Sequence, residues 1–142
     1  MSLPTAEKSP VVPYGMSSLA LAHVGDAVYE LLVRTRLTAA QRTAKTLHAA
    51  TVKLVCAPAQ AQAVQAILPM LTEQETDVYK RARNTRPSHV PHGATPGQYA
   101  QATALEALFG YLYLSGELAR IEELFNICWT ALQQPDLPTN QG

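Results

Sequence analysis

The sequence has few cysteines and no long hydrophobic run, and each absence excludes a class of protein. Its 142 residues include only two cysteines, Cys56 and Cys128, which are too few for a disulfide framework. No apolar segment reaches the roughly 18–20 residues that a membrane span requires. The first sixteen residues contain Pro4, Pro10 and Pro13 and lack the apolar core of a secretory signal. We therefore expect a cytoplasmic protein rather than a secreted or membrane-spanning one.

The chain also lacks net charge, yet its charges are unevenly distributed. Residues 31–105 contain nine basic and three acidic residues, whereas residues 106–142 contain one basic and five acidic residues. A middle segment with this excess can form a local positive face that attracts a polyanion. The charges can equally be scattered over a solvated surface, and composition alone leaves both interpretations open.

The residues that are abundant indicate helices. The chain contains 22 alanines and 18 leucines, and no β-branched or aromatic segment alternates with period two. We therefore expect one all-α domain over residues 17–132, between flexible extensions at 1–16 and 133–142. Its six helices are predicted at residues 17–37, 42–55, 58–67, 72–83, 98–114 and 117–132. Between the fourth and fifth, residues 84–97 hold three prolines and two glycines and are predicted to form a long loop.

A polar stripe runs along the first predicted helix. This helix is apolar almost all round, which favours a central position in the fold and a role as a dimer face. His23, Asp26, Glu30 and Arg34 recur at intervals of three and four and so share one side of it. The stripe is either a salt-bridge ladder, with Glu30 paired to Arg34, or part of a metal site, and the helix alone favours the ladder.

The fifth predicted helix contains a single carboxylate. Apart from histidines, Glu106 is the only charged residue between Arg86 and Glu117. A lone carboxylate in so apolar a helix must be protonated, paired or metal-bound. Asp26 and Glu106 could together hold one Mg²⁺, which prefers oxygen ligands and often uses one or two protein carboxylates. Gly25, beside Asp26, and Gly110, one turn after Glu106, would allow the two helices to approach closely.

Basic residues are concentrated where the fourth helix ends. The segment KRARNTR, residues 80–86, holds four of the eleven basic residues, and the proline-rich loop follows it directly. A basic helix end that leads into a loop suits contacts with nucleic-acid phosphates. Compensation of the helix dipole is the alternative, and it accounts more easily for two of these charges than for four.

Five segments in order resemble one family of nucleases. HVGDAVYELLVR, residues 23–34, resembles the signature helix of the ribonuclease III catalytic domain, and its GDAVYE form resembles the Mini-ribonuclease III branch. The segments LH (47–48), KLVCAPAQA (53–61), KRARN (80–84) and ALEALFGYLYLSG (104–116) agree with that family in the same order. The resemblance covers about residues 17–126.

The resemblance implies a homodimeric, all-α endoribonuclease that cuts double-stranded RNA with Mg²⁺ and matures the stem of precursor 23S ribosomal RNA. Asp26 and Glu106 would be its catalytic residues and metal ligands. The residues implied to contact RNA are Lys80, Arg81, Arg83, Asn84 and Arg86, and the implied supporting residues are Glu30, Arg34 and His48. A non-catalytic RNA-binding or ribosome-assembly factor is the alternative.

The chain departs from the full-length family pattern at two acidic positions. Ala22 stands where that pattern has a glutamate four residues before Asp26, and Thr103 stands where it has an aspartate three residues before Glu106. With half of the usual four carboxylates missing, a tightly held second metal ion is not expected.

Overall fold

The structure is a computed structural model that describes residues 13–40, 43–85 and 89–134. Six α-helices occur within these residues, which confirms the all-α prediction. They are α1 (Ser18–Thr38), α2 (Ala44–Val55), α3 (Ala57–Ile67), α4 (Glu73–Arg83), α5 (Pro96–Leu114) and α6 (Leu118–Gln133). Short 3₁₀ turns lie at Pro13–Gly15 and Leu68–Met70. No helix among the described residues is both long enough and apolar enough to cross a membrane.

Local capping explains where the helices begin. Ser17 and Thr43 cap α1 and α2 with their hydroxyls, and Thr72 forms the expected capping box with Glu75 at α4. A second capping box, between Thr95 and Gln98, starts α5 at Pro96. The expectation that residues 84–97 are entirely non-helical is therefore wrong at its end, because proline is well suited to the first helical turn. The predicted start of the second helix, at residue 42, lies outside the described residues.

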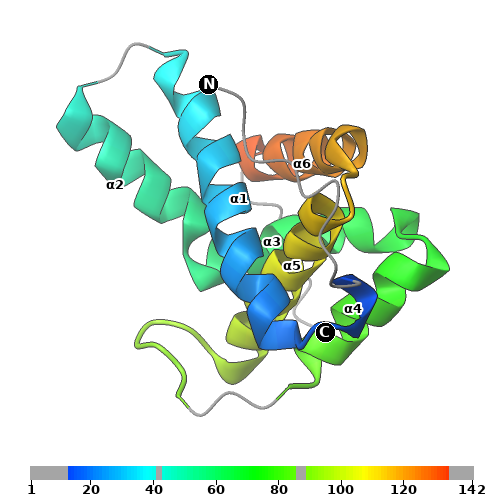
Figure 1. Ribbon diagram of the computed structural model, residues 1–142. Helices are drawn as coiled ribbons and strands as arrows, with labels where there is room; N and C mark the ends of the chain where they lie inside the picture. The colour runs from blue at the N-terminus through cyan, green and yellow to red at the C-terminus, as the bar shows by residue number, and fades with distance from the viewer. Residues whose placement is uncertain (1–12, 41–42, 86–88, 135–142) are drawn as a thin grey trace.

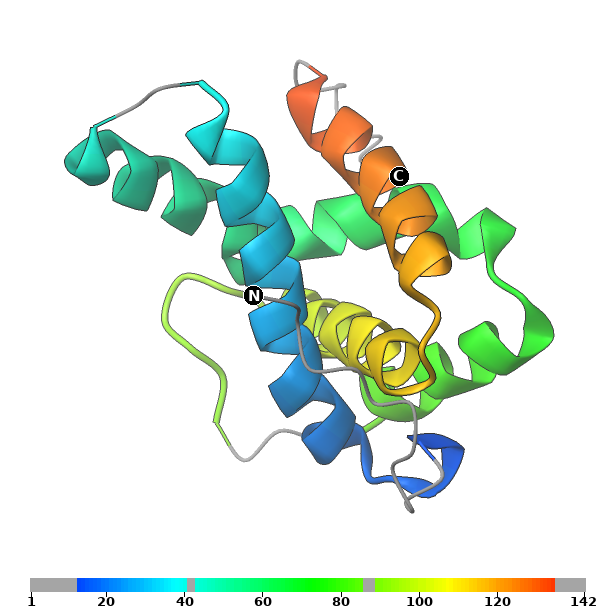
Figure 2. The ribbon, with the colours of Figure 1, turned by 45° about the horizontal axis from the view of Figure 1, so that its top comes forward.

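Helix α5 is the centre of the fold. Figure 2 shows it (yellow) enclosed by α1, α3, α4 and α6, and it packs against each of these four helices. Nine of its residues, from Ala102 to Leu112, are buried. The expectation that the first helix is central is therefore wrong for the single chain. Helix α1 buries one face, whereas Leu19 and Leu31 on its other faces are exposed.

Two glycines set the distance between α1 and α5, which cross in close contact (Figure 1). A Cβ atom at Gly25 would overlap the backbone carbonyl oxygen of Glu106, and one at Gly110 would overlap the carbonyl oxygen of Leu21. The two helix backbones are thus in direct contact, as expected from the sequence. Because Gly25 touches the backbone of Glu106 itself, the contact places the adjacent Asp26 beside Glu106.

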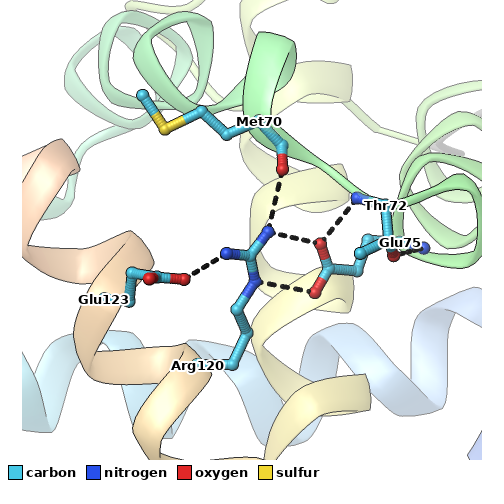
Figure 3. A network of polar contacts seen from close by, with 5 residues as sticks. All are labelled: Met70, Thr72, Glu75, Arg120 and Glu123. Carbon is cyan, nitrogen blue, oxygen red and sulfur yellow. Dashed lines mark hydrogen bonds and ion pairs between the residues drawn. The ribbon is translucent and has the colours of Figure 1, made fainter.

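A partly buried ion-pair network joins α4 to α6 (Figure 3). The Arg120 guanidinium donates to both carboxylate oxygens of Glu75, at 3.0 and 2.9 Å, and to the backbone carbonyl of Met70 at 2.9 Å. It also pairs with Glu123, while Glu75 accepts a hydrogen bond from the backbone N–H of Thr72. This network fixes the start of α4, whose other end carries the basic residues.

Arg120→Ala is expected to lower the free energy of unfolding by about 2–3 kcal/mol, because it leaves the Glu75 carboxylate buried without its cation. Burial by itself would raise the pKa of Glu75, but hydrogen bonds from Arg120 and Thr72 bring it below its ordinary value. The network therefore stabilises the fold above the ordinary glutamate pKa, and this contribution is lost as the pH falls through the lowered value. Urea unfolding at pH 7 and pH 4 measures both effects, and the two proteins should differ less at pH 4.

Arg34→Ala is the matched control, since Arg34 forms only an exposed i,i+4 pair with Glu30 and should cost less than about 0.5 kcal/mol. Equal losses for the two variants would contradict the importance of the network.

Candidate active site

Asp26 and Glu106 meet where α1 crosses α5. Their side chains are hydrogen-bonded to each other, and Asp26 is exposed while Glu106 is partly buried. Burial, the negative charge of Asp26 and the hydrogen bond to it together raise the pKa of Glu106 to about 8. With a pKa of about 8, Glu106 keeps its proton at neutral pH while no cation is bound. Two acids pressed together in this way form a site that a cation would stabilise.

A third side chain, Gln60 of α3, reaches the same carboxyl group. Its amide lies close enough to lower the pKa of Glu106, as a hydrogen-bond donor does, and the residue is only 2% exposed. The sequence analysis did not single out Gln60, which is one of three glutamines in AQAQAVQA. A signal was nevertheless present, because Gln60 lies four residues before Val64 and seven before Ile67 and so shares their buried face.

A cavity of about 310 Å³ opens beside Glu106. The α2–α3 junction from Val55 to Pro58 and the loop from Pro91 to Ala94 form two of its walls. Helix α5 supplies the third wall through Tyr99, Thr103 and Glu106. The cavity lets a ligand approach Glu106, and its lining includes the second half of the proline-rich loop with His92.

The donor set fits a hard divalent cation. Among the described residues, no group of three or more histidine, cysteine, aspartate or glutamate side chains could hold a metal ion. The carboxylates of Asp26 and Glu106 provide oxygen donors without sulfur or imidazole. That chemistry suits Mg²⁺, which retains several water ligands and needs only one or two protein carboxylates.

The implied supporting residues are not part of this cluster. Glu30 pairs with Arg34 at 3.3 Å, which is the salt bridge that the sequence suggested. His48 is exposed on α2 and does not line the cavity beside Glu106.

The basic residues at the end of α4 are exposed, but they are not equally available. Arg81 lies 3.8 Å from Asp77, donates to the backbone carbonyl of Tyr14 at 3.3 Å, and its guanidinium lies 4.8 Å from the centre of the Tyr14 ring. Tyr14 also donates a hydrogen bond to Asp77. Arg81 therefore holds the Pro13–Gly15 turn against α4.

The other basic residues have looser contacts. Arg83 lies over the ring of Tyr79, with its guanidinium 5.8 Å from the ring centre, and contacts Asn84 at 3.4 Å. Lys80 is exposed beside the open pocket formed by Tyr14 and α4. Arg86 lies outside the described residues.

A six-helix domain with an aspartate–glutamate pair between two helices and a basic helix end has the form of a ribonuclease III-type endoribonuclease. The family model for the ribonuclease III domain matches residues 19–117 of the chain. A crystal structure of a protein from Fusobacterium nucleatum superposes with a TM-score of 0.76 at 32% identity, covering 82% of this chain and 93% of that one.

The curated relatives identify a narrower family within the ribonuclease III class. The Mini-ribonuclease 3 of Thermoanaerobacter sp. is 40% identical over 120 residues, which are 84% of each chain. That of Symbiobacterium thermophilum is 42% identical over 79% of this chain and 87% of its own. That of Gloeobacter violaceus is 42% identical over 94% of this chain and 98% of its own. The chain belongs to the Mini-ribonuclease 3 family, and it is an endoribonuclease of the ribonuclease III class.

Proposed function

We propose that the protein is a Mg²⁺-dependent endoribonuclease that cleaves double-stranded RNA, and that its natural substrate is the stem of precursor 23S ribosomal RNA. The observation that carries the proposal is the Asp26–Glu106 pair, in which Asp26 is exposed and Glu106 lines a cavity. The ribosomal substrate rests on the family resemblance.

In this proposal Asp26 and Glu106 hold the ion and act as the catalytic residues. Mg²⁺ held by these residues would supply an activated water molecule and would neutralise charge that develops on the phosphate. The fixed contact of α1 with α5 holds the two carboxylates at a constant separation. A phosphate bound at the site would therefore keep a constant position relative to them. Attack of water on phosphorus with cleavage of the bond to the 3′-oxygen, which takes up a proton as it leaves, would give 5′-phosphate and 3′-hydroxyl ends.

The end of α4 is the proposed RNA contact. Lys80, Arg83 and Asn84 are exposed there and suit contacts with phosphate oxygens. Arg81, which is engaged by Asp77 and Tyr14, would contribute mainly by holding its segment in place. A-form duplexes are recognised largely by shape and by backbone contacts, so we expect little sequence preference and a steep loss of binding with salt.

The test is cleavage of a long RNA duplex by the unmodified protein, with Mg²⁺ or with a chelator, beside single-stranded RNA of the same sequence. We expect cleavage only of the duplex and only with Mg²⁺. Binding of the duplex without cleavage under all conditions would favour a non-catalytic RNA-binding factor instead. The ribosomal assignment is tested separately, with a transcript of the 23S precursor stem against an unrelated duplex of equal length.

The affinity for Mg²⁺ is expected to rise about tenfold per pH unit below pH 8 and to level off above it. The reason is the pKa of about 8 at Glu106, since below that pH a proton must leave the pair when the ion binds. Titrations of the protein with Mg²⁺ in the absence of RNA, at pH 6.5, 7.5 and 8.5, measure this dependence. The same affinity at all three values would contradict a protonated pair.

The proposed active form is a homodimer joined through α1. One face of α1, from His23 to Leu32, lines an apolar groove of about 480 Å³ together with Tyr113, Leu118 and Ile121. Leu31 and Leu118 are 44% and 46% exposed, which is unusual for large aliphatic side chains so close together. A second copy on this face would be related to the first by a two-fold axis and would give the dimer two active sites.

Leu31→Glu is expected to convert the dimer to a monomer, because it introduces a charge into an apolar interface. Sedimentation equilibrium measures the change, and Leu19→Glu, at an exposed leucine outside the groove, is the control. A wild-type protein that is monomeric at all concentrations would refute the dimer.

A further inference from the structure

Among the described residues, Gln60 is a buried amide whose burial is not explained by a contact within its own helix. The described residues contain three buried polar or charged side chains, Thr51, Gln60 and Glu75. Thr51 donates to the carbonyl of Leu47 one turn earlier, and Glu75 belongs to the Arg120 network. Gln60 instead projects from α3 to a carboxyl group on α5. Burying an amide costs free energy, and an apolar residue at this position would pack on α5 without that cost.

The cavity places Gln60 and Glu106 side by side. Both line it, together with the uncharged Thr103, which lies one turn before Glu106 on α5. The Gln60 amide can donate a hydrogen bond to the Glu106 carboxylate. An ionised Asp26 has no hydrogen to donate and can only accept hydrogen bonds. When both acids are ionised, their repulsion drives the two groups apart. An amide donor held in the protein interior restrains the ionised Glu106 carboxylate to one orientation.

We propose that Gln60 is a positioning residue, whose amide holds the Glu106 carboxylate in the orientation required to bind a divalent cation with Asp26. The inference rests on the proposed function, since it presupposes that the carboxyl pair binds the ion. A site with only two carboxylates has no third acid to compensate for a misplaced one. Partners that orient metal ligands typically affect metal affinity by 10–100-fold.

The experiment is Mn²⁺ binding to the full chain without RNA, followed by electron paramagnetic resonance of the free ion. Gln60→Met removes the donor while keeping an unbranched side chain of similar length. We expect it to weaken Mn²⁺ binding about 10–100-fold. The matched control is Gln62→Met, at an exposed glutamine two residues further along α3, which should bind Mn²⁺ as the wild type does.

The outcomes separate this inference from the proposed function. If the wild type binds no Mn²⁺, both fail. If the wild type binds Mn²⁺ and Gln60→Met binds it equally well, only the positioning role fails. A loss of the same size in Gln62→Met would also overturn it, because the effect would then belong to the helix and not to the amide at position 60.

A measurement on the unmodified protein covers the case in which Gln60→Met does not fold. Side-chain amide signals in ¹H–¹⁵N NMR report the hydrogen bond directly. The Gln60 amide is expected to exchange slowly with water and to shift when Mg²⁺ is added, whereas the Gln62 amide should do neither. Rapid hydrogen exchange of the Gln60 amide, together with a chemical shift that does not change when Mg²⁺ is added, would refute the proposal.

Discussion

Glu106→Gln is expected to reduce cleavage of an RNA duplex in Mg²⁺ by at least about 100-fold while leaving duplex binding almost unchanged. Loss of a partner that merely orients a metal ligand already costs up to about 100-fold, so loss of a ligand should cost at least as much. Glutamine has nearly the same size and hydrogen-bonding reach, and it can still contact Asp26 and Gln60. The change therefore removes a charge without disturbing the packing of α5.

Rates of cleavage and electrophoretic mobility shifts, measured on the same duplex, separate the two effects. Glu117→Gln is the control, because Glu117 is exposed beyond the other end of α5 and should leave both quantities as they are. If neither the wild type nor Glu106→Gln cuts while both bind equally, the catalytic role of Glu106 is refuted. The protein would then be better described as an RNA-binding factor.

Gly25→Ala is expected to lower the free energy of unfolding by more than about 3 kcal/mol, and the melting temperature by roughly 10 °C. The new methyl group would overlap the carbonyl oxygen of Glu106 and lie 2.8 Å from the backbone nitrogen of Gly110. Both neighbours are backbone atoms of a central helix, so neither can move aside as a flexible side chain would. Helices α1 and α5 must separate, and Asp26 must move away from Glu106.

Thermal unfolding measures the loss of stability, and Mn²⁺ binding at a temperature where the variant is folded measures the displacement of Asp26. Gly97→Ala is the matched control in the first turn of α5, where a Cβ meets nothing closer than the Thr95 hydroxyl oxygen at 3.9 Å. It should be neutral or stabilise the protein by up to about 1 kcal/mol, since alanine favours a helix more than glycine does. If Gly25→Ala melts like Gly97→Ala, the close helix contact is not present.

The pairing of Asp26 with Glu106 was predictable because each acid stands out in its own helix. A lone carboxylate in the apolar fifth helix needs a partner, and Asp26 was the acid with a glycine beside it. The two glycines indicated that these helices touch, and the structure shows the contact at the backbone of Glu106. The catalytic roles of both acids remain proposals that the variants above test.

Other features could not be read from the chain. The uniformly apolar first helix suggested a central position, but periodicity cannot distinguish burial in a core from a face left open for a second chain. The basic run at residues 80–86 gave no sign that Arg81 is engaged by Tyr14, sixty-seven residues away. Likewise, Gln60 looked like its exposed neighbours Gln62 and Gln65.

The sequence by itself determined the helices, their caps and the acids, because hydrophobic periodicity, capping boxes and helix-breaking residues act over a few neighbouring positions. The tertiary structure decided which helix is central and which side chains meet at one point. It also raised the pKa of Glu106, brought the Gln60 amide to that carboxyl group, and formed the cavity that part of the proline-rich loop lines. These properties arise from groups on different helices, and burial and electrostatic interaction depend on distances that only the packed chain defines.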